Sequence, residues 1–253
     1  PLRTFDPEVW VDPTGRLWLI WAQAVSHGHN AHTWTIIAED ANAANPKWGA
    51  VRMLAQGVMM CKPTVLKDGT WAFPICDWEA RRSKAPDKVS AGLWSSSDQG
   101  ETLIFKGAAL VPVEHRTVDE HILVERRDGS IWSLIRTLYG IGESISTDGG
   151  KSWSVTTPSA LAHPSARFFI RRLQSGNLLL VKHGPIAEKT RRSHLTAFIS
   201  KDDGKSWSGG LLLAERSISY PDGQQAKDGT IYIAHDHSRY GHREILFAAF
   251  CEE

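Results

Sequence analysis

The chain has 253 residues, which is long for one domain by simple averages, and 42% of them are hydrophobic. Its formal net charge of +1 at pH 7 excludes a general nucleic-acid binder, because such proteins need a large basic excess. No apolar run approaches the ~20 residues of a transmembrane helix, so no membrane-spanning segment is expected.

Five glycine-containing turns each join two short apolar runs. The turn glycines recur at separations of 54, 60, 47 and 53 residues, in the order Gly15, Gly69, Gly129, Gly176 and Gly229. The first turn joins Pro7–Val11 to Leu17–Trp21, and the third joins Ile122–Glu125 to Ile131–Arg136. Turns of this kind are typical of β-hairpins. Each therefore predicts the hairpin between the first and second strands of one repeated unit.

A second repeat, with the pattern Ser-x-Asp-x-Gly-x-(Ser/Thr)-(Trp/Leu), runs out of phase with the first. It occurs three times, around Asp98, Asp148 and Asp202, which are 50 and 54 residues apart. That separation is the length of one four-stranded propeller blade. In such a turn Asp can bond its own backbone, Gly supplies a positive φ, and the aromatic residue anchors the turn. We expect the three aspartates on peripheral turns, where they define architecture rather than chemistry.

The two interleaved periods predict an all-β protein. The fold that fits them is a β-propeller of four-stranded antiparallel blades, with five blades visible and almost no helix. Unrelated hairpins in a β-sandwich are the alternative, which the agreement of the two periods disfavours. The repeat also explains several of the eleven tryptophans, because aromatic residues anchor its turns.

The repeated phrase resembles the Asp-box, or BNR repeat, of sialidases (neuraminidases) and several other β-propeller proteins. Sialidases of this kind have six-bladed wheels, and the first turn here is similar to that of their second blade. The resemblance implies that residues 1–253 are a single β-propeller domain, truncated at its N-terminus by one blade. A complete five-bladed wheel is the alternative.

The resemblance to exo-sialidases becomes residue-specific at Glu120, which opens an inner strand and is followed by a Gly turn and a strand ending in Arg136. On the family's pattern, Glu120 is the glutamate that polarises the nucleophile. The family nucleophile is a tyrosine that opens the last blade, and Tyr220 has that place. The chain departs from the pattern at Asp119, where Asn is usual, and at Pro221, directly after the tyrosine.

The resemblance also implies side chains that bind the substrate's carboxylate. Arg136 matches the second arginine of the family's triad. Arg192 matches the third, because it precedes a strand that runs into an Asp-box, and the preceding arginine is the alternative. Arg167 opens another inner strand and would add a further cationic contact. The first arginine and the aspartic general acid belong to the absent blade, so in a five-bladed wheel Asp6 or Arg3 would substitute.

These residue types suit hydrolysis of an acidic sugar. A tyrosine phenol is a poor nucleophile at neutral pH until a neighbouring carboxylate accepts its proton. A neutral phenol also avoids placing a second anion against the substrate's carboxylate, which guanidinium groups can hold bidentately. We therefore predict a sialidase-like retaining exo-glycosidase whose partner is a carbohydrate with terminal sialic acid or a related acidic sugar.

Two other functions are compatible with the same residues. A propeller lyase acting on uronate-containing polysaccharide would use Tyr220, His121 or His163 as acid or base, and its arginines would neutralise the uronate. A non-catalytic propeller would bind glycan or protein.

The cysteines and histidines predict neither a metal nor a cofactor. Cys61, Cys76 and Cys251 are odd in number and form no Cys-x-x-Cys pair, so no zinc site or disulfide framework is expected. The eleven histidines are scattered without convincing ligand spacing. The sequence assigns neither a compartment nor a protein partner.

Overall fold

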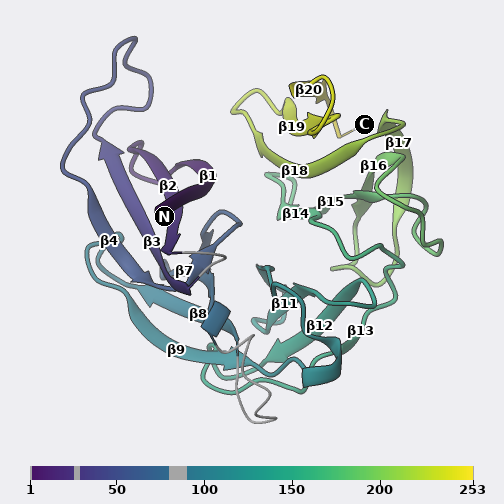
Figure 1. Ribbon diagram of the computed structural model, residues 1–253, viewed down its shortest axis with the longest axis horizontal. Coiled ribbons are helices and arrows are strands. Elements are labelled where there is room, and N and C mark those ends of the chain that lie inside the picture. The colour runs from purple at the N-terminus through teal and green to yellow at the C-terminus, as the bar shows by residue number, and fades with distance from the viewer. Residues whose placement is uncertain (1, 26–28, 80–89, 253) are drawn as a thin grey trace. The chain divides into compact units, whose positions relative to one another are not determined.

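The computed structural model of the chain describes residues 2–25, 29–79 and 90–252. In these ranges the polypeptide forms five antiparallel sheets that follow one another in the sequence (Figure 1). Helix is confined there to the 3-10 turn Val113–His115 and to Trp78–Glu79. None of the helical residues described forms a segment long and apolar enough to cross a membrane. The predicted all-β propeller class is confirmed, with one blade per sheet.

The first two blades are antiparallel meanders. Blade 1 has the strand order β1 (Leu2–Val11), β2 (Leu17–Val25), β3 (His29–Ala38) and β4 (Arg52–Gln56). Blade 2 has the order β5 (Val58–Met59), β7 (Trp71–Cys76), β8 (Ala91–Ser96) and β9 (Ile104–Ala109). The short strand β6 (Thr64–Val65) also pairs with β7.

Two of the other three blades have four strands. Blade 3 has the order β10 (His121–Glu125), β11 (Ile131–Arg136), β12 (Ile141–Ser146) and β13 (Thr157–Pro158). Blade 4 has the order β14 (Phe169–Arg172), β15 (Leu178–His183), β16 (Leu195–Ser200) and β17 (Ser208–Ala214). Blade 5 has the order β18 (Ile218–Gln225), β19 (Ile231–His237) and β20 (Glu244–Phe250).

Blade 5 departs from the four-stranded prediction. Within the described residues it has three strands, and β20 is its outer edge, with Ile245 and Phe247 exposed. Only Cys251 and Glu252 come after β20 in the described part of the chain, too few residues for a further strand. The absent N-terminal blade stays a prediction.

The chain divides into two compact units. The first unit comprises Pro1–Ile135 and Ser144–Thr156, and the second comprises Arg136–Glu143 and Thr157–Glu253. Each unit has its own apolar core, because strands with covered faces carry apolar side chains in continuous or alternating runs. Large buried side chains of the first core are Trp10, Trp18, Trp71 and Phe73, and those of the second include Phe169, Leu179, Ile231 and Ile233.

In blades 1, 3, 4 and 5 the predicted hairpin turn joins the first strand to the second, and in blade 2 it joins the short strand β6 to β7. In each turn the glycine N–H bonds to the carbonyl three residues earlier, at 2.9 to 3.1 Å. The glycine φ angles lie between 85° and 92°, in the left-handed region that side chains disfavour. The periodic glycines therefore predicted these hairpins correctly because the turn geometry requires that residue.

The three Asp-boxes lie between the third and fourth strands of blades 2, 3 and 4. In each box the Asp accepts a hydrogen bond from the Ser hydroxyl two residues earlier, at 2.7 to 2.8 Å. It also accepts one from the Ser or Thr hydroxyl four residues later, at 2.5 to 2.6 Å. These bonds lower the pKa of all three aspartates, which face solvent to differing degrees. In each box the Asp is therefore hydrogen-bonded within its own turn, as the sequence predicted.

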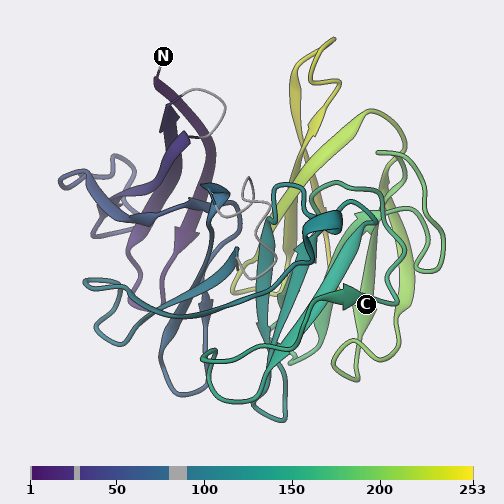
Figure 2. The same ribbon diagram turned by 60° about the horizontal axis from the view of Figure 1, so that its bottom comes forward.

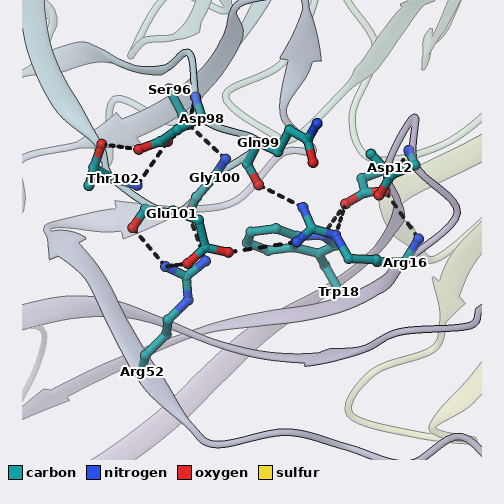
Figure 3. Close-up of polar contacts among 11 residues, drawn as sticks. Asp12, Arg16, Trp18, Arg52, Ser96, Asp98, Gln99, Gly100, Glu101 and Thr102 are labelled. Carbon is teal, nitrogen blue, oxygen red and sulfur yellow. Dashed lines mark hydrogen bonds and ion pairs between the residues drawn. The ribbon is translucent and has the colours of Figure 1, made fainter.

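The first turn of blade 1 is tied to the first Asp-box (Figure 3). Buried Asp12 accepts hydrogen bonds from Trp18 Nε1 (2.8 Å) and Arg16 Nε (2.7 Å). Arg16 in turn donates to the Gln99 carbonyl at 2.7 Å, and Arg52 donates to the carbonyls of residues 100 and 101 at 2.6 and 3.0 Å. Both guanidiniums also lie within 5.5 Å of the Trp18 ring centroid. The network therefore fixes blade 1 against blade 2.

Candidate functional site

The innermost strands of the blades carry predicted site residues at one shared position. The residues nine positions before the glycine of each first turn are Asp6, Met60, Glu120, Arg167 and Tyr220. Glu120 directly precedes β10, and Arg167 lies two residues before β14. Asp6 and Tyr220 lie within β1 and β18. Because propeller blades repeat one geometry, these chemically different side chains occupy equivalent places in their blades.

Asp6 and Tyr220 also share an unusual backbone. Each is followed by proline, and each lies where the pairing register of its strand shifts in a β-bulge. Their φ angles are 51° and 53°, in a region that residues other than glycine rarely adopt. Asp119, directly before Glu120, has a φ of 51° as well. Bulges re-aim side chains, and strained residues of this kind cluster at functional sites.

In the first unit Glu120 is buried, with 3% of its surface exposed. The preceding Asp119 is fully buried and accepts hydrogen bonds from the Ser90 hydroxyl (2.5 Å) and the Thr117 N–H (3.1 Å). Burial raises the pKa of the Cys76 thiol, and the negative charges of Glu120 and Asp119 raise it further. Glu120 is therefore a buried carboxylate within electrostatic reach of Cys76, at the end of β7.

An ion pair is buried beside Asp6. Glu8, two residues further along β1, lies 3.6 Å from the ammonium nitrogen of Lys62. Both side chains are at least 94% buried and stand seven residues before their turn glycines, so the pair joins equivalent positions of blades 1 and 2. Sequence motifs predicted neither Glu8 nor Lys62 as a partner in this pair. Their equivalent spacing from Gly15 and Gly69 is the signal that would have found both.

In the second unit two guanidinium groups lie close to the ring of Tyr220. The Cζ atoms of Arg167 and Arg239 are 5.4 and 4.2 Å from the centroid of its ring. Arg167 is 7% exposed and Tyr220 is half-buried. Arg239 is held by Asp236, whose Oδ2 lies 2.8 Å from the Arg239 Nε. Sequence reasoning predicted Tyr220 and Arg167 but missed Arg239 and Asp236. Strand pairing places Asp236 opposite Ser219, and the folded β19–β20 loop brings Arg239 to the ring.

Arg192 lies beside the strand that carries Tyr220. Its guanidinium donates to the Ser219 hydroxyl at 2.9 Å and to the Ser165 carbonyl at 3.5 Å. The first contact is one residue from Tyr220, and the second is two residues from Arg167. Arg191 and Arg192 are both exposed, and it is Arg192 that contacts Ser219 and Ser165. Three of the predicted residues are thus gathered in the second unit.

Arg136 and the remaining predicted residues are distributed between the two units. Arg136 belongs to the second unit, where it ends β11 and is half-buried. Its positive charge contributes to lowering the pKa of His163, a smaller effect than burial. Glu120 and Asp6 belong to the first unit.

A buried histidine pair supports the elements around Tyr220. His163 Nε2 lies 3.1 Å from His183 Nδ1, and His183 Nε2 lies 3.2 Å from the carbonyl oxygen of Ile218. Because a carbonyl can only accept, His183 Nε2 carries the proton of the neutral ring, and His183 Nδ1 therefore accepts a hydrogen bond from the Nε2–H of His163. Burial lowers the pKa of His183 to about 4 and that of His163 well below its usual range. The pair is therefore neutral at pH 7, and it links the segment before β14 to the start of β18.

The two histidines proposed as acid or base for a lyase are enclosed. His121 is 2% exposed, and its Nε2 lies 2.8 Å from the Gly92 carbonyl oxygen. Burial lowers the pKa of His121 to about 4. His163 is 1% exposed and bonded to His183. Neither side chain is placed to exchange a proton with a polysaccharide.

Among the described residues, no group of three or more His, Cys, Asp or Glu side chains is arranged to hold a metal ion. Cys61 and Cys76 are buried free thiols. The chemistry assembled in the second unit is that of guanidinium groups around a phenol, which suits an anionic ligand.

Sequence comparison places the chain in a family. The sequence profile described as BNR repeat-like domain matches residues 3–233. The chain belongs to the BNR repeat-like domain family. None of the curated proteins that were compared matches this BNR repeat-like protein. The family assignment agrees with the three Asp-boxes and their hydrogen bonds.

Solved structures resemble the fold of the BNR repeat-like protein at low sequence identity. An intramolecular trans-sialidase from Ruminococcus gnavus is 18% identical, with a TM-score of 0.63 over 89% of this chain and 51% of its own. A Trypanosoma rangeli sialidase mutant with trans-sialidase activity is 15% identical, with a TM-score of 0.66 over 97% and 44%. An endo-arabinase from Bacteroides thetaiotaomicron is 11% identical, with a TM-score of 0.57 over 98% and 94%. The protein therefore has a fold that glycoside hydrolases use, and it spans about half or less of the two sialidase-type chains.

Proposed function

We propose that the protein is a retaining glycoside hydrolase that acts on a terminal acidic sugar, with Tyr220 as its nucleophile. The observation that carries the proposal is the position of the half-buried Tyr220 ring, 5.4 Å from the guanidinium carbon of buried Arg167 and one residue from the serine that Arg192 contacts. A phenol among guanidinium groups can attack a sugar while the cations hold that sugar's carboxylate.

In the proposed first step, the phenol oxygen of Tyr220 attacks the anomeric carbon and the glycosidic C–O bond breaks. The phenol proton passes to Glu120, and the departing oxygen takes a proton from Asp6. In the second step, water releases the sugar from tyrosine by the reverse transfers, so the anomeric configuration is retained. Glu120 and Asp6 belong to the other unit, and their participation rests on their equivalent positions in their blades and on the family resemblance.

The proposed substrate is terminal sialic acid or a related acidic sugar. Arg136, Arg167 and Arg192 would bind its carboxylate, since paired guanidinium hydrogen bonds recognise that group. The resemblance to sialidase-type folds supports this choice. The enclosed His121 and His163 disfavour a lyase that uses a histidine as acid or base. A lyase that uses Tyr220 is distinguished from the hydrolase by its unsaturated product.

The proposal is tested with fluorogenic glycosides of sialic acid, glucuronic acid and galactose. We expect hydrolysis of an acidic glycoside and not of the neutral one. Tyr220→Phe should lower kcat by on the order of 10³-fold while binding of the acidic sugar persists, and Arg136→Ala should weaken binding itself. Tyr232→Phe, which alters an exposed tyrosine on β19, is the matched control and should leave turnover unchanged.

Full activity of Tyr220→Phe would contradict the proposed nucleophile. Binding without hydrolysis of any glycoside would favour the non-catalytic alternative, and release of an unsaturated uronate would favour the lyase.

A further inference from the structure

The loop between β19 and β20 is folded back on itself and on the start of β18. The Ser238 N–H bonds to the Ser217 carbonyl at 2.8 Å, and the Ser238 carbonyl accepts from the N–H groups of Gly241 (2.8 Å) and Arg243 (3.0 Å). Figure 2 shows this hairpin, coloured yellow, with its loop projecting from the end of the sheet. The loop therefore has a defined backbone, and it carries Arg239 next to the strand of Tyr220.

Asp236 fixes the direction of the Arg239 side chain. Its Oδ2 accepts hydrogen bonds from both Nε and a terminal nitrogen of Arg239, the first at 2.8 Å. Asp236 pairs in register with Ser219, the residue before Tyr220. Asp236, which holds the guanidinium, thus lies across the strand pair from the residue that precedes Tyr220.

The guanidinium of Arg239 covers one part of the Tyr220 ring at 4.2 Å, the closer of the two cation contacts. Burial opposes the charge of Arg239, but hydrogen bonds with Asp236 and Tyr220 outweigh it, so its pKa is raised. Arg239 remains 39% exposed, so this arginine is not a buried structural ion. Arg239 contacts the Tyr220 ring and Asp236.

We propose that Arg239, held by Asp236, is a positioning residue that orients the Tyr220 ring and stabilises negative charge on the phenol oxygen during turnover. This role rests on the function proposed above. A cation over an aromatic ring favours the electron-rich form of that ring. The phenol is electron-rich twice in the proposed reaction, when its proton leaves and when the sugar departs from its oxygen. Asp236 keeps the cation in place while Tyr220 holds a strained φ of 53°.

The ring contact is tested by fluorine NMR on protein labelled with fluorotyrosine. The chain has 4 tyrosines, and Tyr220→Phe identifies the Tyr220 resonance by its loss. We expect Arg239→Gln and Asp236→Asn to move that resonance and to leave the resonances of Tyr139 and Tyr232 in place, while Tyr240 directly follows Arg239 and is not used as a reference. Arg243→Gln is the matched control, because Arg243 is an exposed arginine of the same loop. An unmoved Tyr220 resonance in Arg239→Gln would overturn the proposal.

The catalytic consequence is tested on the acidic glycoside that the wild type hydrolyses. Arg239→Gln should lower kcat about 10-fold, between the scales of an exposed and a desolvated cation–π contact, with KM changed less than about two-fold. Arg239→Lys should restore part of the loss, and Arg243→Gln should match the wild type. Equal kcat values for Arg239→Gln and wild type would overturn the positioning role and leave the proposed function standing. A wild type that hydrolyses no glycoside would remove both, and the NMR shift would then report a structural contact alone.

Discussion

At the scale of single residues, Asp12 shows how one buried carboxylate can organise a turn. It is 4% exposed and accepts hydrogen bonds from Thr14, Arg16 and the buried indole of Trp18. Burial raises its pKa, but these donors lower it by more, so the net shift is downward. Asp12→Ala should lower the free energy of unfolding by about 3 kcal/mol, because charged hydrogen bonds are lost and a buried donor loses its acceptor.

Urea unfolding measures that change. Asp68→Ala is the control, because Asp68 occupies the corresponding turn of blade 2 but is exposed and accepts a backbone bond from Thr70. An equal effect of the two substitutions would contradict the role given to the Trp18 network.

The buried histidines make stability depend on pH in a defined window. Burial lowers the pKa of His121 and His183 from 6.5 to about 4, and that of His163 also falls. The unfolded chain therefore binds more protons than the folded chain between pH 6.5 and 4. Stability is fully present above pH 6.5 and is lost as pH falls toward 4, by on the order of 3 kcal/mol each for His121 and His183. Unfolding midpoints measured across this window check the expectation, and a flat profile would contradict it.

At the scale of elements, the Asp-boxes act as local clamps that are independent of the candidate site. Asp148 is exposed, and its carboxylate accepts from the hydroxyls of Ser146 and Ser152. Asp148→Ala should lower the melting temperature by several degrees, through loss of these turn bonds. The affinity for an acidic sugar should stay unchanged. Loss of affinity at an unchanged melting temperature would show that the box takes part in binding.

The elements also show how far the sequence could predict the fold. Turn glycines at positive φ and the Ser, Asp and Gly of each box are required by local geometry, so their spacing gave the hairpins, the boxes and the blade repeat. The bulges at Asp6 and Tyr220 depend on strand pairing, which has no local sequence signature beyond the proline after each. The three strands of blade 5 could not be predicted from the glycine spacing either, because its turn at Gly229 matches the turns of the four-stranded blades.

The sequence indicated some residues of the candidate site and not others. Tyr220, Arg167 and Arg192 stand near strand openings or ahead of an Asp-box. In the second unit Arg167 lies over the Tyr220 ring, and Arg192 contacts the residue before Tyr220. Arg239 reaches that ring only through a folded loop and its bond to Asp236. No spacing rule along the chain predicts such a contact.

At the scale of the whole molecule, the repeat gives each blade one inner position, and four of the five blades fill it with Asp6, Glu120, Arg167 or Tyr220. A propeller built from such blades can assemble acid, base, cation and nucleophile from distant parts of the sequence. We therefore propose that Tyr220 forms the covalent bond to the sugar. Glu120 and Asp6 would transfer protons, and Arg167 would bind the carboxylate.

The most direct test of this claim is peptide mapping after reaction with a fluorinated sialic acid that forms a long-lived glycosyl-enzyme. Trypsin cleaves after Arg216 and Lys227, so it releases a peptide, residues 217–227, in which Tyr220 is the sole tyrosine. If Tyr220 is the nucleophile, mass spectrometry should find the sugar on this peptide, and Tyr220→Phe should abolish the adduct. A sugar adduct on any other peptide, or hydrolysis of sialosides by Tyr220→Phe at the wild-type rate, would contradict it.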